Sequence, residues 1–133
     1  MEVQNIERKV FALMGQALIE REFTSASEVN LVEGMVLGTI SASGKLTICK
    51  SGATDGSQYP VAIAKYSQNI AAGATENVTA YNAGTFDASG VIFDGSDTFA
   101  TVVDSKTMLD RLIGDTKGMA FENVQNLTTP YGD

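Results

Sequence analysis

The stretch from Gly34 to Lys65 most constrains the fold, because it divides into short apolar runs separated by turn residues. We expect strands over residues 35–40, 45–50 and 61–64. Gly44 and the Asp55-Gly56 pair adopt positive φ at low steric cost, which favours tight turns between the runs. Pro60 cannot donate a backbone hydrogen bond, so it belongs at the start or the edge of a strand. The stretch therefore predicts a compact β scaffold.

The chain after this stretch also consists mainly of short apolar runs separated by turn residues. Further strands are expected over residues 78–82, 85–87, 91–93, 98–103 and 118–124, with a loop over 66–77. One helix of about nine residues is predicted, with Asp104 or Ser105 as its N-cap and Gly114 as its stop. Its apolar stripe is formed by Met108, Leu109, Leu112 and Ile113. The fold class is therefore mainly β: a small β-clip or barrel-like domain of short strands, one short C-terminal helix and an N-terminal arm.

The first thirty residues have a different pattern. Ile6, Val10, Leu13 and Leu18 fall on helical spacing, although the run from Val10 to Leu13 also fits a strand. Such a segment is too short to be stable alone, so we expect an arm that gains order by packing on another surface. We divide the chain into an arm and connector (1–30), a β domain (31–125) and a C-terminal tail (126–133).

Catalytic chemistry is not expected from this sequence. The chain has no histidine, which removes the usual activated serine and cysteine nucleophiles and most zinc sites. Asp87, Asp94, Asp97 and Asp104 form the best group of carboxylates, but turn preference explains the Asp94–Asp97 segment equally well. We therefore predict a protein that is not an enzyme, with no catalytic residues, no cofactor and no metal.

Charge and cysteine content limit the partners. The net charge of −7 is spread evenly along the chain, which opposes binding to nucleic acid and to anionic membranes. No apolar run is long enough for a transmembrane helix, and no secretory signal is expected. The single Cys49 excludes an intrachain disulfide, and its apolar neighbours suggest a packed side chain. The expected partners are proteins, with no nucleic acid and no membrane.

Four ordered segments carry a resemblance to a known family. They are Leu31–Ile40 (LVEGMVLGTI), Gly44–Leu46 with Ala53–Ala64 (ATDGSQYPVAIA), Asn82–Asp87 (NAGTFD) and Met108–Gly114 (MLDRLIG). The second is the most specific. In this order they resemble the bacteriophage head decoration proteins, the family of the lambda capsid-stabilising protein D.

The resemblance implies a structural virion protein with a clip-like β fold. Such a protein is a homotrimer on the outer surface of the expanded capsid, at three-fold and quasi-three-fold sites, where it stabilises the lattice of the major capsid protein. It is made in the cytoplasm of the bacterial host. In this family the N-terminal segment becomes ordered on the capsid, although the arm of this chain is longer and more apolar. If the arm adds a strand to a capsid edge, Val10, Phe11, Leu13 and Leu18 are the candidate contacts with the capsid or within the trimer. Alternatively, these side chains complete the protein's own core.

Two other functions stay open at this point. The first is a non-catalytic binding module, such as a glycan-binding surface domain, although the chain has no tryptophan to stack on sugars. The second is a metal-dependent enzyme on a trimeric β-clip, which would use the acids between Asp87 and Asp104.

Overall fold

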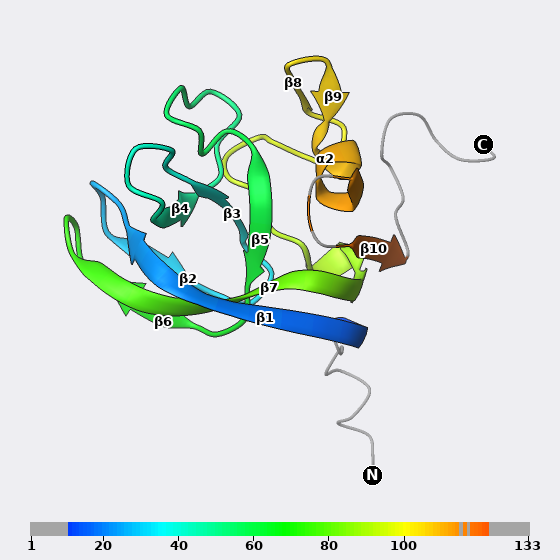
Figure 1. Ribbon diagram of the computed structural model, residues 1–133, viewed down its shortest axis with the longest axis horizontal. Helices are drawn as coiled ribbons and strands as arrows, with labels where there is room; N and C mark the ends of the chain where they lie inside the picture. Colours follow the sequence, from blue (N-terminus) through cyan, green and yellow to red (C-terminus); the bar gives the residue numbers. More distant parts are fainter. Residues whose placement is uncertain (1–10, 115, 117, 123–133) are drawn as a thin grey trace, which may run out of the picture.

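The main structural element is a six-stranded sheet with the strand order β1-β4-β3-β5-β7-β10 (Figure 1). The computed structural model describes residues 11–114, 116 and 118–122. The strands of the main sheet are β1 (Ala12–Thr24), β3 (Val36–Thr39), β4 (Leu46–Ile48), β5 (Pro60–Ala64), β7 (Thr75–Asp87) and β10 (Met119–Glu122). Because β1 also pairs with β7, the sheet closes on itself like a barrel, and β10 joins only through β7. This confirms the predicted fold class.

Smaller elements complete the domain. They are β2 (Val29–Leu31) paired with β6 (Gln68–Ile70), the hairpin of β8 (Val102–Val103) and β9 (Lys106–Thr107), a 3-10 turn (Ala88–Gly90) and the helix α2 (Met108–Gly114). In Figure 1 the β8–β9 hairpin and α2 lie on one side of the molecule, and β1 runs along the other side. The helix therefore leaves β1 uncovered.

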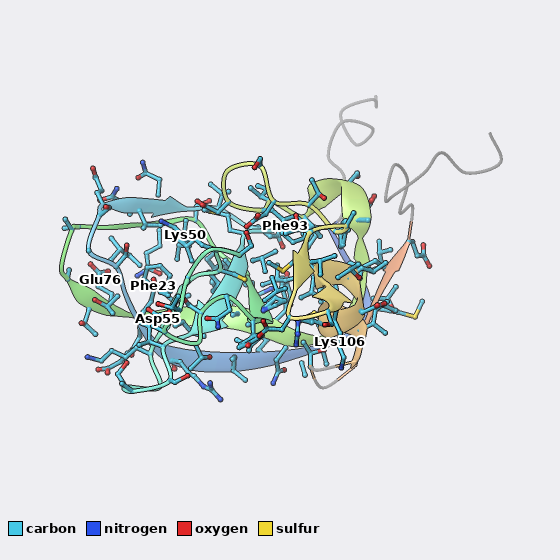
Figure 2. The ribbon with its side chains drawn as sticks, turned by 90° about the horizontal axis from the view of Figure 1, so that it is seen from above. Phe23, Lys50, Asp55, Glu76, Phe93 and Lys106 are labelled. Atoms are coloured by element: carbon cyan, nitrogen blue, oxygen red, sulfur yellow. The ribbon has the colours of Figure 1, made fainter. Side chains whose placement is uncertain are left out.

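The central strands bury both of their faces. Successive residues alternate between two separate core clusters: Leu37 and Ala62 belong to one cluster, and Val36 and Ile63 belong to the other. The cluster with Leu37 and Ala62, which we call the first, fills the barrel and includes the fully buried Phe23 of β1. Glu76 of β7, the register partner of Phe23, is exposed at the outer margin of the sheet (Figure 2). The second cluster lies under α2. Burial on both faces explains why β5 is apolar throughout instead of alternating.

The three strands and two turns predicted between Gly34 and Lys65 are confirmed as β3, β4 and β5. The long bend before β5 folds back on the β3–β4 turn, where the Ser41 N–H donates to the Asp55 carbonyl at 2.8 Å. Gly56 has φ +103°, and a Cβ there would lie 2.1 Å from the Ser41 Oγ. This glycine is therefore required both by its backbone conformation and by the close approach of the two turns.

Several predicted elements differ from the structure. The arm contains a strand of 13 residues, β1, which pairs antiparallel with β7, and no helix is found over residues 11–24. The connector (22–30) and the loop (66–77) contain parts of β1, β2, β6 and β7. Residues 83–84 do not form a turn, because pairing with β1 and β10 keeps β7 continuous to Asp87. The strand expected over 91–93 is reduced to one bridge between Met35 and Ile92.

The C-terminal helix is confirmed, but its predicted N-cap is wrong. Asp104 and Ser105 have positive φ (51° and 77°) and form the turn of the β8–β9 hairpin, so the strand expected over 98–103 is limited to β8. Thr107 caps the helix instead, since its Oγ1 accepts a hydrogen bond from the Asp110 N–H at 3.1 Å. Met108 and Leu112 of α2 are fully buried in the second core cluster. The predicted strand over 118–124 corresponds to β10; residues 126–133 lie outside the described residues.

Candidate interaction surfaces

One side of β1 has almost no strand partner in the described structure. β1 pairs with β7 from Thr24 to Ala12, and its other edge meets β4 only at Phe23. Residues 12–22 therefore present backbone N–H and C=O groups along a free edge. Native sheets usually cover or interrupt such an edge, because it can pair with another chain. We call this the open edge of β1.

The predicted contact residues fall into different environments. Phe11 is buried, with 8% of its surface exposed, and belongs to the second core cluster. Leu13 and Leu18 are 37% and 49% exposed on β1. Val10 lies outside the described residues. A role of these side chains in capsid or trimer contact stays a prediction, but Phe11 contributes to the protein's own core.

Phe11 fixes the beginning of β1. Its ring stacks on Phe86 with centroids 5.2 Å apart and is tilted against Tyr81 at 6.1 Å. Its carbonyl accepts a hydrogen bond from the Asp87 N–H at 2.9 Å. A Cβ on Gly90 would lie 2.7 Å from the Phe11 ring, so the ring packs directly on the glycine backbone. The chain is thus anchored at the point from which β1 extends.

A groove of about 380 Å³ lies on the face of the sheet that β1, β7 and the end of β5 share. It is lined by Phe11, Ala12, Gln16, Leu18, Glu33, Lys65 and Tyr81. The side chains come from β1, from the turn between β2 and β3, from the end of β5 and from β7. The groove lies where the second core cluster, to which Phe11 and Tyr81 belong, reaches the protein surface.

Three polar side chains in this groove are held together. The Tyr81 hydroxyl donates to the Glu33 Oε2 at 2.7 Å, and the Lys65 Nζ donates to the Tyr81 hydroxyl at 3.4 Å. The Lys65 ammonium also lies 5.0 Å from the centroid of the Tyr81 ring and 5.1 Å from that of Tyr66. Burial, followed by the hydrogen bond to Glu33, raises the pKa of Tyr81, so its hydroxyl remains a donor. The groove thus holds one fixed cation and one fixed anion.

Sequence reasoning missed this group. Glu33, Lys65 and Tyr81 are far apart in the chain, and each has an ordinary local context. Only the pairing of β5 with β7, in which Ile63 lies opposite Tyr81, brings them together. The one available signal was Tyr81 within an alternating strand, which does not identify its partners.

Three of the four aspartates considered for metal binding, namely Asp87, Asp97 and Asp104, serve separate structural roles. Asp87 accepts hydrogen bonds from the Ser89 N–H and Oγ, and Asp97 accepts from the Ser51 N–H at 2.9 Å and Oγ at 2.7 Å. Asp104 accepts from the Tyr59 hydroxyl. Within the described part of the chain, no three residues of the metal-ligating types form a group that could hold an ion.

Cys49 is a buried structural side chain, as predicted. It is 2% exposed in the second core cluster, and its Sγ lies 3.6 Å from the Gln58 carbonyl. Burial, with a smaller contribution from the charges of Asp97 and Asp94, raises the pKa of the thiol to about 12. The reactive thiolate is therefore suppressed.

Across the described residues, no helix has the length and apolar character needed to cross a membrane. A small β domain with an exposed strand edge is a form typical of proteins that act through contact with other proteins.

Comparison with known families defines the class further. A family model described as bacteriophage lambda head decoration protein D matches residues 8–108, which include β1 and the first three of the four segments that carry the resemblance in the sequence. The match ends at Met108, where the fourth segment begins. The family consists of structural proteins of the phage head, which bind the capsid. The chain belongs to the bacteriophage lambda head decoration protein D family. No match was found among curated proteins.

Proposed function

We propose that this protein is a homotrimer that binds the outside of the expanded phage capsid at three-fold and quasi-three-fold sites and stabilises the lattice of the major capsid protein. The observation that carries this proposal is the family match over residues 8–108. Synthesis in the host cytoplasm belongs to the same proposal and fits the single reduced Cys49.

Bracing a lattice requires contacts and no chemistry. A trimer presents three identical contact surfaces to a three-fold site, so after the first contact the others form within one complex. The effective local concentration then raises the overall affinity well above that of a single contact. Weak contacts by each copy are therefore sufficient for stable attachment.

The contact segment in this proposal is the beginning of the chain together with the first half of β1. Val10, Leu13 and Leu18 contact the capsid subunit or a neighbouring copy, with Leu13 and Leu18 already exposed for it. Phe11 holds this segment in place through its ring contacts with Phe86 and Tyr81. A rigid anchor reduces the entropy that the segment loses on binding.

Binding to heads tests the proposal directly. Purified protein is mixed with expanded heads that lack a decoration protein, and bound protein is measured after sedimentation of the heads. We expect saturation at three copies per local three-fold site, and heads with a higher temperature of disruption. A folded protein that does not bind such heads would refute the function.

A set of three variants separates the contact residues from the anchor. Leu13→Ala with Leu18→Ala is expected to reduce head binding while changing the free energy of unfolding by less than about 1 kcal/mol. Phe11→Ala removes a buried ring and is expected to cost about 3 kcal/mol of stability. The reverse pattern, with the leucine variant unstable and fully active in binding, would assign Leu13 and Leu18 to the protein's own fold.

A further inference from the structure

The tripeptide Asp-Gly-Ser occurs twice in the chain, at residues 55–57 and 94–96, and both copies lie in turns. In an Asp-Gly pair the backbone nitrogen of the glycine can approach the carboxyl carbon of the aspartate closely, because glycine has no Cβ to hinder it. The two atoms can then close a five-membered ring, which changes the backbone. Since the two tripeptides are identical, their surroundings decide which of them reacts.

The first copy is held by hydrogen bonds on both reacting groups. The Asp55 Oδ1 accepts from the Ser57 Oγ at 2.6 Å and from the Ser57 N–H at 3.0 Å, and the Gly56 N–H donates to the Gln58 Oε1 at 2.8 Å. The hydrogen bonds from Ser57 also lower the pKa of Asp55, so its carboxyl group stays ionised and is a poor target for a nucleophile. Ring closure at this copy requires that these bonds break first.

The second copy has no such bonds. Within the described part of the chain, neither the Asp94 carboxylate nor the Gly95 N–H forms a hydrogen bond or an ion pair. Gly95 has φ +57°, and a Cβ there would have no neighbour within 4 Å. Both residues are exposed, and they line a groove of about 430 Å³ between this turn and the bend before β5. The two reacting groups are therefore free to meet, with water beside them.

We propose that Asp94-Gly95 is a site of spontaneous modification, at which the aspartate is converted to isoaspartate through a succinimide. The Gly95 nitrogen attacks Cγ of the protonated Asp94 carboxyl group; an N–Cγ bond forms, the nitrogen loses its proton, and the hydroxyl leaves as water. Water then opens the ring. Attack at Cγ restores aspartate, whereas attack at the main-chain carbonyl carbon leaves Gly95 joined through the side chain. One water is lost and one is gained, and no other reactant takes part.

Conversion at Asp94 affects a contact between two loops. Isoaspartate adds one methylene to the backbone and displaces the Asp94 carbonyl, which accepts from the Asp97 N–H at 3.0 Å. The Asp97 carboxylate in turn accepts from the Ser51 N–H at 2.9 Å and from its Oγ at 2.7 Å. The modification therefore loosens the tie between this turn and the bend before β5. This inference goes beyond attachment to the capsid and does not depend on it.

Labelling with heavy oxygen tests the proposal, since each ring opening inserts one oxygen atom from the solvent. The folded protein is incubated in mildly acidic buffer made with heavy-oxygen water, and peptides that contain Asp94 or Asp55 are compared by mass spectrometry. We expect the label to appear at Asp94 at least about tenfold faster than at Asp55, because the hydrogen bonds at Asp55 must break first. In denaturant the two rates should agree within about threefold, because neither turn is then formed.

Two variants assign the label to the proposed groups. Asp94→Glu keeps the charge but needs a six-membered ring, so labelling at this position should disappear. Gln58→Ala frees the Gly56 N–H and should accelerate labelling at Asp55. Equal rates at the two copies in the folded protein, or a faster rate at Asp55, would overturn the proposal.

The product is measured in the same samples. An isoaspartyl methyltransferase should modify the Asp94 peptide of the incubated wild type, and label without isoaspartate would overturn the conversion. Hydrogen exchange at the Ser51 amide should be faster in the isoaspartyl form than in fresh protein. Unchanged exchange would show that the contact between Asp97 and Ser51 survives the modification, contrary to the inference.

Discussion

β5 and β1 belong to the same sheet but differ in almost every physical respect. β5 is short, pairs with β3 and β7 on its two edges, and buries side chains on both faces. β1 has 13 residues, pairs fully on one edge only, and keeps most of its side chains exposed. The sheet therefore contains a stable centre and a margin that is open to contact.

This difference shows where selection for stability and selection for binding can act separately. The two core clusters meet across β3, β5 and β7, so a change there affects both. The exposed part of β1 contributes little to either cluster, because the residues of β1 among the described members and neighbours are Ala12, Ile19 and Phe23, and of these Phe23 alone is fully buried. Changes at its exposed residues should therefore alter contacts while the fold remains.

The largest expected contrast is between two leucines. Leu37 of β3 is fully buried, and Leu18 of β1 is 49% exposed. Leu37→Ala should lower the free energy of unfolding by about 3–5 kcal/mol, through lost burial and the cavity left behind. Leu18→Ala should cost less than about 1 kcal/mol. Denaturant unfolding of both variants measures the contrast, and equal losses would show that β1 is as much a part of the core as β3.

Two glycines with positive φ give a smaller contrast. Gly34 has φ +104°, and a Cβ there would lie 2.1 Å from the Gly90 carbonyl oxygen. Gly15 of β1 has φ +70° and nothing within 4 Å. Gly15→Ala should cost about 1–2 kcal/mol for its backbone conformation alone. Gly34→Ala should cost clearly more, because the backbone must also move.

Thermal unfolding of the two alanine variants checks this ranking. If Gly15→Ala lowered the stability more than Gly34→Ala, the backbone of the irregular first half of β1 would contribute more to stability than its exposure indicates.

The smallest effect concerns pH. The pKa of Cys49 is raised from 9.0 to about 12 in the folded protein, so the unfolded chain loses the thiol proton first as pH rises. The contribution of Cys49 is therefore fully present below about pH 9 and is lost progressively between about pH 9 and pH 12. Cys49→Ala should make the stability less dependent on pH in this range. Unfolding curves from pH 8 to 10.5 measure the difference, and parallel curves would contradict it.

The sequence predicted the centre of the fold better than its margin. The strands between Gly34 and Lys65 have strong local signals, such as Gly44, Gly56 and Pro60, and all three were found. For the arm the sequence left helix and strand open, because its apolar residues fit a helical spacing while Val10–Leu13 also fits a strand. Pairing with β7, which the sequence does not show, decides for a strand and extends it to Thr24. The N-cap was misplaced because Asp104 and Ser105 satisfy local preferences equally well in a hairpin turn.

The candidate surface was predictable only in part. The sequence identified Leu13 and Leu18 as apolar side chains of the arm, and the structure leaves them exposed. It could not identify Glu33, Lys65 and Tyr81 as neighbours, because their proximity depends on long-range strand pairing. Nor could it distinguish Phe11 from the other apolar residues, since burial against Gly90 is a property of the tertiary structure.

The burial of Cys49 has a practical consequence for following assembly. The chain has one thiol, and that thiol is protected from solvent and from ionisation. A single cysteine introduced on β1, for example Glu22→Cys, would therefore be the one site that a maleimide dye modifies in the folded protein. Fluorescence from that dye would report the loading of each particle in real time, without removal of the native residue.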